Sequence, residues 1–258
     1  MQTEVTELDG VVYRSPKPQS ATVMALLHHL VAVGFEASPR PVGTGFAPDG
    51  REALVYIEGE SPQPQEWSDE AVWSIGRLVH DLHVATSSFE PPPNARWQPW
   101  FARELPGRHP VIGHGDLGPW NILAVDTVPV AFIDWDNAGP VDAVWELAQV
   151  AWLNAQLHDD DVAERNHLPP AADRARQLGL VVDAYELTRD ERERFVDVLV
   201  EMAVRSARQE AIDHDVGPDS EAIADNGFPV LWGITWRARS AAWMLEHRDL
   251  LARALRSS

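Results

Sequence analysis

The sequence predicts an α+β protein with a small strand-containing segment at its N-terminus and a mostly helical remainder. Short β-prone runs flank an Asp9-Gly10 turn, and one helix and another strand follow within the first 60 residues. Beyond residue 60, apolar residues recur mainly at helical spacing. The exception is a pair of short apolar runs between residues 122 and 133, which predicts a second hairpin.

Within the first 60 residues, the expected hairpin pairs 3–8 with 11–14. A helix over 21–33 follows and ends at Gly34, and residues 39–50 are expected to be mostly loop before a strand over 52–57. The apolar face of this helix is expected to consist of Val23, Leu26, Leu27, Leu30 and Val31.

After a Pro-containing linker, Ser68 is expected to cap a helix that ends near residue 85. Thr188 and Glu191 form a capping box that opens the longest helix. Further helices are expected over 97–105, from 141 past 152, over 169–183 and over 229–255, with a solvated acidic loop at Asp159, Asp160 and Asp161. In the last helix, Trp232, Trp236 and Trp243 are expected in the core.

Composition limits the function. The 258 residues suffice for one large or two modest domains. A net charge of −19 disfavours binding to nucleic acid or to anionic membranes, and the absence of cysteine excludes disulfides and thiolate metal sites. There is no apolar run of membrane-spanning length and no visible secretory signal, so we expect a cytoplasmic protein. The strong preference for arginine over lysine, with abundant alanine and proline, indicates a bacterial source rich in G+C.

Chemistry-bearing residues concentrate between His114 and Pro140. His114, Asp116 and Asn121 form an H-x-D-x-x-x-x-N pattern, and Asp134 comes thirteen residues after Asn121. Asn121 precedes the apolar run 122–125 and Asp134 follows the run 130–133, so a hairpin places both at the same end. The amide oxygen and the carboxylate that converge there are hard ligands, which suit Mg²⁺ completed by phosphate oxygens.

Asp116 lies on an irregular loop that contains glycine and proline, five residues before Asn121. It can therefore approach the same point as a general base. Phosphoryl transfer requires a base that orients a hydroxyl and a metal that neutralises phosphate charge. The segment thus predicts phosphoryl transfer.

This segment resembles the aminoglycoside phosphotransferase family, which is related to protein kinases and choline kinases. The resemblance implies a protein-kinase-like two-lobed fold. Residues 1–60 would form a reduced α/β nucleotide-binding lobe, and residues 61–258 a mostly helical lobe with the catalytic loop and substrate pocket. It further implies the following roles: Asp116 as catalytic base, Asn121 and Asp134 as Mg²⁺ ligands, His114 as a structural brace and Asp136 in a secondary role.

The resemblance also implies ATP or GTP as co-substrate and a small-molecule hydroxyl as acceptor, for example on an aminoglycoside-like antibiotic or a related natural product. The backbone of Tyr56, Ile57 and Glu58 would meet the nucleotide base, as the hinge of this family does. Arg14 is the nearest match to the usual phosphate-binding strand lysine, and Lys17 is the second.

The chain departs from the family pattern at several points. No glycine-rich hairpin precedes residue 14, and the first helix carries His28 and His29 where an acidic partner is usual. Glu146 begins a Glu-Leu-Ala where the family usually has Asp-Leu-Ala, whereas the segment 79–83, V-H-D-L-H, recurs in similar proteins.

Two other functions remain open on the sequence. The missing glycine loop and strand lysine suit a non-catalytic, pseudokinase-like binding protein. A metal phosphohydrolase built from His80 and Asp81 with His114 and Asp116 is weaker, because His80 and His83 lie in a helical pattern that favours packed or hydrogen-bonded side chains. The sequence leaves the acceptor and the oligomeric state undetermined.

Overall fold

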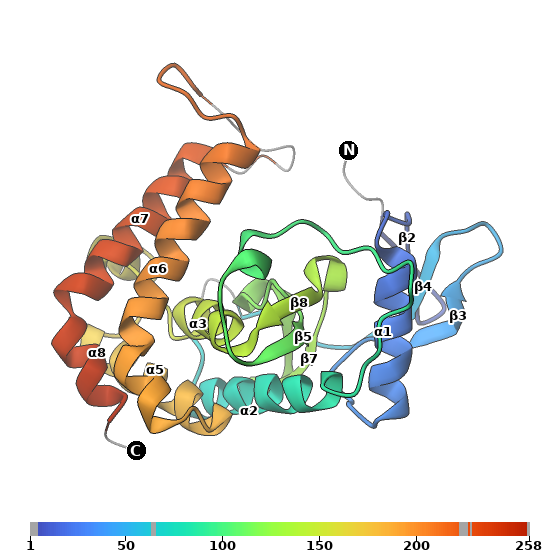
Figure 1. Cartoon of the computed structure of the whole chain (residues 1–258), viewed down its shortest axis with the longest axis horizontal. Helices are drawn as coiled ribbons and strands as arrows, with labels where there is room; N and C mark the ends of the chain where they lie inside the picture. Colours follow the sequence, from blue (N-terminus) through green and yellow to red (C-terminus); the bar gives the residue numbers. More distant parts are fainter. Residues whose placement is uncertain (1–4, 63–65, 222–226, 228, 257–258) are drawn as a thin grey trace. The chain divides into compact units, whose positions relative to one another are not determined.

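The computed structural model describes residues 5–62, 66–221, 227 and 229–256 (Figure 1). It confirms the α+β class. The described residues form two compact units, one within residues 5–62 and 78–146 and the other within residues 66–77 and 147–256. The boundaries of these units differ from the single predicted lobe boundary at residue 60. The division into two lobes at that residue stays a prediction. No helix among the described residues is long and apolar enough to cross a membrane.

The first unit begins with an antiparallel sheet of order β1-β2-β4-β3, whose strands are β1 (Thr6–Leu8), β2 (Val11–Arg14), β3 (Pro41–Phe46) and β4 (Glu52–Val55). Asp9 and Gly10 both have positive φ, 52° and 74°, as the two-residue hairpin turn requires. Strand β3 lies in the region that was expected to be mostly loop. The strand is irregular: it pairs with β4 only at its two ends, and Gly43 and Gly45 between them have positive φ. Pairing of β2 with β4 sets Arg14 opposite Glu52.

Helix α1 (Ser20–Ala32) connects β2 to β3. Its predicted apolar face is buried at Val23, Leu26, Leu27 and Leu30. Val31 was wrongly expected to face inward: it is 43% exposed, since it lies at the edge of the stripe.

The rest of this unit contains two antiparallel pairs of strands. Strands β6 (Ile122–Val125) and β7 (Val128–Phe132) pair as predicted, with the turn residues Asp126 and Thr127 at positive φ. Strands β5 (Pro110–Gly113) and β8 (Gly139–Asp142), which the sequence did not predict, also pair antiparallel. Their register sets Gly113 opposite Gly139, so the chain leaving β5 and the chain entering β8 lie side by side. A 3₁₀ turn, Phe101–Glu104, is the short helix expected over 97–105.

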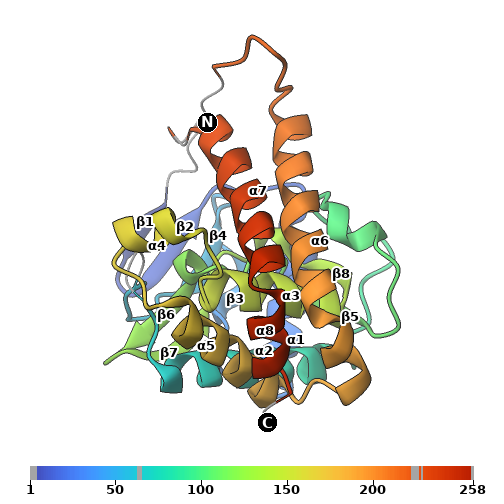
Figure 2. The ribbon, with the colours of Figure 1, turned by 90° about the vertical axis from the view of Figure 1, so that its left-hand side faces the viewer.

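Two helices cross the boundary between the units, α2 (Asp69–Thr86) and α3 (Ala143–Asn154). The second unit otherwise contains α4 (Asp160–Arg165), α5 (Ala171–Tyr185), α6 (Arg189–Asp213), α7 (Val230–Glu246) and α8 (Arg248–Ala254). The capping box of Thr188 and Glu191 opens α6 as predicted. Helices α6 and α7 lie side by side in two perpendicular views (Figures 1 and 2).

Two expectations about the helices of this unit need correction. The acidic triplet is not a loop but the start of α4: Asp159 caps this helix and binds Arg239, Asp161 also binds Arg239, and Asp160 binds Arg174. The predicted final helix is two helices, α7 and α8, which meet at His247.

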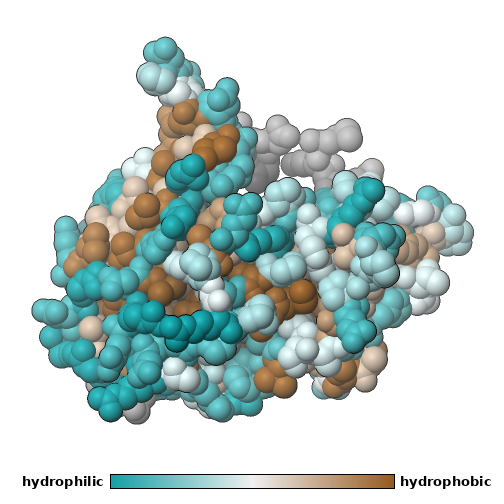
Figure 3. All heavy atoms as spheres, in the orientation of Figure 1, coloured by the Kyte–Doolittle hydropathy of each residue, from teal (hydrophilic) through white to brown (hydrophobic). Residues whose placement is uncertain are grey.

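The tryptophans of α7 differ in burial. Trp243 is buried and Trp236 stacks on the buried Trp152, with ring centroids 5.4 Å apart, whereas Trp232 is 39% exposed. The expectation of a core position is therefore wrong for Trp232. Figure 3 shows further apolar side chains at the surface of the α6–α7 pair. Val204 of α6 and Leu231 of α7 are exposed.

Candidate active site

The buried side chain of His114 stabilises the loop after β5 through hydrogen bonds to the backbone. Its imidazole is fully buried, lies with its ring centroid 4.7 Å from that of Trp135, and contacts the carbonyl oxygen of Ile133 through Nε2 at 2.9 Å. Its Nδ1 accepts a hydrogen bond from the backbone N–H of Asp116 at 3.3 Å, so Nε2 is the donating nitrogen. Burial lowers the pKa of His114 to about 4, which keeps this neutral tautomer at physiological pH.

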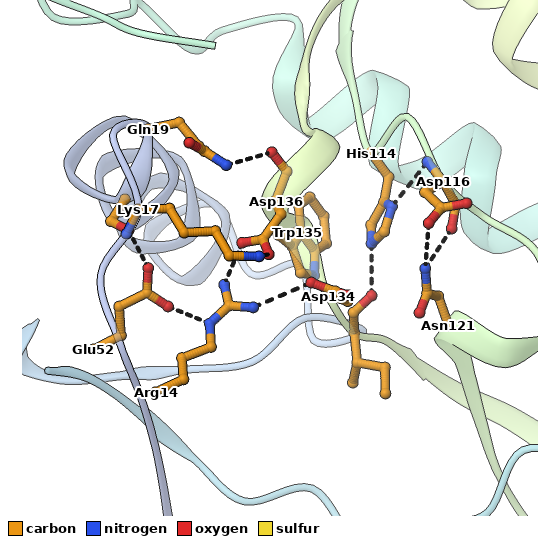
Figure 4. A network of polar contacts seen from close by, with 12 residues as sticks. Arg14, Lys17, Gln19, Glu52, His114, Asp116, Asn121, Asp134, Trp135 and Asp136 are labelled. Carbon is orange, nitrogen blue, oxygen red and sulfur yellow. Dashed lines mark hydrogen bonds and ion pairs between the residues drawn. The ribbon is translucent and has the colours of Figure 1, made fainter. Parts of the chain in front are cut away.

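Asp116 and Asn121 are joined directly. The side-chain Nδ2 of Asn121 donates to the backbone oxygen of Asp116 at 2.8 Å and to its Oδ2 at 3.0 Å. The 3₁₀ turn Pro119–Asn121 sets this geometry, and the amide oxygen of Asn121 points away from Asp116 (Figure 4). From Gly113 to Asn121, every residue is buried except Asp116 and Trp120. Asp116 thus offers a partly accessible carboxylate on an otherwise packed loop.

Asp134 follows β7 and faces the same end of the hairpin as Asn121, because the backbone N–H of Ile133 donates to the carbonyl oxygen of Asn121 at 2.9 Å. Its φ of 59° and ψ of 66° put it in the left-handed region, which turns its side chain away from the strand line. The Asp134 side chain is 52% exposed, and that of Asp136 is 12% exposed. The structure therefore places Asp116, Asn121 and Asp134 around one hairpin end, as the spacing predicted.

The donor set fits a hard divalent cation. The amide oxygen of Asn121, which accepts no hydrogen bond from the described residues, and the exposed carboxylate of Asp134 are oxygen ligands of the kind that Mg²⁺ takes. Among the described residues, no group of three or more His, Cys, Asp and Glu side chains is arranged to hold a metal by itself. A cation here would consequently need phosphate oxygens or water to complete its shell.

Two cations reach the carboxylates, Arg14 at the end of β2 and Lys17 between β2 and α1 (Figure 4). Arg14 donates through Nη1 to Asp134 at 3.1 Å and through Nη2 to Asp136 at 2.8 Å, and its Nε binds Glu52. Lys17 forms an ion pair with the other oxygen of Asp136. Sequence reasoning had singled out Arg14 and Lys17, but not Glu52.

The two carboxyl groups differ in acidity. Partial desolvation by the surrounding protein and the neighbouring Asp136 raise the pKa of Asp134, although half of its side chain is exposed, and Arg14 only partly offsets this. Burial acts the same way on Asp136, but Arg14 and Lys17 outweigh it and hold the pKa of Asp136 below its ordinary value. Asp136 is therefore the firmly ionised member of the pair.

The predicted hinge follows β4. The N–H of Tyr56 donates to the carbonyl oxygen of Gly10 at 2.8 Å, and Glu60 forms a two-bond bridge with Ala124. Within the described part of the chain, the backbone N–H groups of Ile57 and Glu58 have no protein acceptor. They are available to a ligand, and the hinge assignment itself stays a prediction.

Glu146, which the sequence marked only as a departure from the family pattern, braces the loop after β5. It is fully buried, accepts the N–H of Gly115 at 2.6 Å, and lies 2.6 Å from Nε2 of His83. Burial opposes ionisation, but the hydrogen bonds from His83 and Gly115 prevail and lower the pKa of Glu146. The signals for this pair were the Glu-Leu-Ala run and the V-H-D-L-H segment, but nothing in the sequence joined them.

Arg103, also missed, supports the chain that follows Asp134 and Asp136. Its guanidinium donates to the backbone oxygens of Asn137 at 2.8 Å and of Ala138 and Pro140 at 3.2 Å. Burial lowers the pKa of Arg103 to about 10. In the sequence it is a lone arginine within the predicted short helix over 97–105, which has no distinguishing pattern.

The histidines do not form the metal site of a phosphohydrolase. His80 contacts its neighbour Asp81 at 3.1 Å, and His83 is bound to Glu146. Both ring nitrogens of His114 are engaged with the backbone. His80 and His83 are thus hydrogen-bonded helix residues, as the helical pattern indicated.

The sequence model that describes the phosphotransferase enzyme family (APH) matches residues 61–190, which is half of the chain. The chain belongs to this family. A trifolitoxin immunity protein of Rhizobium leguminosarum bv. trifolii is 50% identical over 254 residues, which cover 98% of this chain and 95% of that protein. As a member, the chain is a small-molecule phosphotransferase, and the resemblance seen in the sequence is confirmed.

Solved structures confirm the kinase-like fold. A microcompartment-associated aminopropanol kinase matches with a TM-score of 0.61 at 12% identity, covering 98% of this chain and 95% of that one. The amicoumacin kinase hAmiN, in complex with AMP-PNP, Ca²⁺ and Ami, matches with a TM-score of 0.58 at 12% identity, covering 98% and 88%.

Proposed function

We propose that this phosphotransferase moves the γ-phosphoryl group of ATP or GTP to a hydroxyl of a small molecule. The observation that carries the proposal is the meeting of Asp116, Asn121 and Asp134 at the open end of the β6–β7 hairpin. A base and two oxygen ligands in this arrangement are the parts that phosphoryl transfer uses.

In this proposal Asp116 orients the acceptor hydroxyl and takes its proton. Asn121 keeps the Asp116 carboxylate in place through its Nδ2, and its amide oxygen, together with Asp134, would hold Mg²⁺. The bound metal would neutralise charge on the phosphates. Arg14 anchors the phosphates, and the hinge amides of Ile57 and Glu58 meet the nucleotide base. His114 and Asp136 act indirectly, through the loop backbone and through Arg14.

The acceptor we propose is a hydroxyl-bearing antibiotic or toxin-like natural product, modified in the bacterial cytoplasm where nucleotide is abundant. The name of the 50% identical relative, an immunity protein against trifolitoxin, supports a role in protection from a toxin. The amicoumacin kinase of the same fold supports nucleotide and divalent metal as reaction components.

Calorimetric titration with magnesium-ATP and magnesium-GTP tests the nucleotide part of the proposal. We expect binding of at least one nucleotide by the wild-type chain and its loss in Asp134→Asn, because the amide is a far weaker metal ligand than a carboxylate. If the wild type binds neither nucleotide, the result would favour the alternative function, a non-catalytic, pseudokinase-like binding protein that does not use nucleotide.

A screen of hydroxyl-bearing natural products, with nucleotide consumption as the readout, tests the transfer. Asp116→Asn is its control: it should bind nucleotide like the wild type and transfer about 10²–10⁴-fold more slowly. Phosphate release from phosphomonoesters without nucleotide would instead point to a hydrolase.

A further inference from the structure

Lys17 is the only lysine of this arginine-rich chain, and its side chain lies at the proposed phosphate site. We propose, on the basis of the function proposed above, that Lys17 is a second phosphate-binding cation. Its ammonium leaves Asp136 and contacts the terminal phosphate of the bound nucleotide, while Arg14 stays fixed. The two cations together then do the work of the absent strand lysine and glycine-rich loop.

Arg14 is the immobile member because it is held on three sides. Of the five N–H donors of its guanidinium, one binds Glu52, one Asp134 and one Asp136. Its side chain is 12% exposed, and its Glu52 partner is 1% exposed. Moving Arg14 would leave the buried Glu52 charge without its ion-pair partner, which is strongly unfavourable.

Lys17 combines a fixed backbone with a mobile side chain. Pro16 and Pro18 flank it and restrict the local backbone. Its N–H donates to Ser20 Oγ at 2.7 Å, and the N–H of Ser20 returns a bond to the Lys17 carbonyl oxygen at 3.0 Å.

Ser20 Oγ in turn donates to Glu52, so the base of Lys17 is tied to the same buried carboxylate that holds Arg14. Beyond its Cα, Lys17 has a single ion-pair partner among the described residues, Asp136, and its side chain is 38% exposed. Four flexible methylenes allow the ammonium to move a few ångströms while the backbone stays in place.

Charge explains why the ammonium would move. Glu52, Asp134 and Asp136 outnumber Arg14 and Lys17 by one negative charge, and the whole chain carries −19. An anionic nucleotide is therefore repelled by the protein as a whole and needs local cations. Asp136 keeps its bond to Arg14 at 2.8 Å when Lys17 departs, so the exchange leaves no carboxylate without a partner.

The single lysine makes a direct test possible. An ATP derivative acylated on its terminal phosphate transfers its acyl group to a nearby amine: the Nζ–C amide bond forms, the C–O bond to phosphate breaks, and ATP leaves as the amine loses its proton. We expect one acylated side chain, Lys17, found by peptide mass mapping and protected by excess magnesium-ATP. The double variant Lys17→Arg/Arg40→Lys, which moves the only lysine to a position where the native side chain is 62% exposed, should not be labelled in an ATP-protected manner.

A binding measurement completes the test. Lys17→Met should raise the dissociation constant of magnesium-ATP about 10- to 100-fold, the loss of one charge-assisted hydrogen bond, whereas Arg40→Met, with equal loss of charge, should leave it unchanged. If the wild type binds nucleotide but Lys17 is neither labelled nor needed for affinity, this inference fails and the proposed function stands. If the wild type binds no nucleotide, both fail. The labelling arm uses the native chain, so it decides the matter even if Lys17→Met does not fold.

Discussion

The close packing of Gly113 against the Glu146 carboxylate provides the sharpest test of how Glu146 stabilises the loop after β5. A Cβ added to Gly113 would lie 2.5 Å from Cδ of Glu146 and overlap its carboxylate oxygens, whereas ordinary van der Waals contact begins at 3.4 Å. Gly113 does not have a positive φ, so alanine is not penalised by the backbone itself. The cost of Gly113→Ala therefore comes from displacing Glu146.

Displacement breaks two hydrogen bonds of a fully buried carboxylate, to His83 and to the Gly115 N–H, both 2.6 Å long. Loss of a buried ionic partner costs about 3–5 kcal/mol, so we expect Gly113→Ala to lower the free energy of unfolding by about that amount. Glu146→Asp withdraws the carboxylate by about 1.5 Å, one C–C bond, and should cost about 1–3 kcal/mol because it no longer reaches both donors.

The double variant should lose less free energy of unfolding than the two single variants lose together, by at least about 1 kcal/mol. The reason is that the shorter acid makes room for the new methyl group. Urea unfolding, followed by tryptophan fluorescence and circular dichroism together, measures all four corners of the cycle. Gly217→Ala is the control: nothing lies within 4 Å of its Cβ position. Additive losses, or a Gly113→Ala variant within about 1 kcal/mol of the wild type, would refute the reasoning.

Three further predictions follow from the same loop. Gly115→Ala should cost about 2–4 kcal/mol and most transfer activity, because φ is +82° and a Cβ there would overlap the Asn137 backbone; native-like unfolding in urea would contradict this. Asp116→Asn should lower kcat by about 10²–10⁴-fold with nucleotide affinity kept, as single-turnover transfer and calorimetry would show; near-native turnover would exclude Asp116 as the base. The imidazole of His114 should titrate near pH 4 by NMR. Since the unfolded chain takes up this proton near pH 6.5, stability should fall as the pH drops from about 6.5 to about 4, by about 3 kcal/mol for this group; titration near pH 6.5 would contradict the buried brace.

The segment from His114 to Asp134 could be interpreted from sequence because its information is local. The hairpin 122–132 is encoded by two β-prone runs and a two-residue turn, and hairpin geometry alone brings Asn121 and Asp134 to one end. The N-terminal hairpin, helix α1 and the capping box of α6 were predictable for the same reason, since each depends on neighbours within a few residues.

The contacts that support the site join residues far apart in the chain. Arg14 meets Asp136 across 122 positions, and His83 meets Glu146 across 63. The ladder of β5 with β8, which sets Gly113 opposite Gly139, likewise has no local signal, because its strands are short and separated by the hairpin between them. No periodicity or spacing rule reports such pairs.

The sequence by itself therefore determined the family and the α+β class and predicted the candidate site residues, because these reside in short-range patterns. Only the tertiary structure decided how those residues are held: Glu52 fixing Arg14, Glu146 bracing the loop, and Lys17 resting on Asp136. A buried charge must find its partner wherever the fold delivers one, and that choice is made by packing in three dimensions.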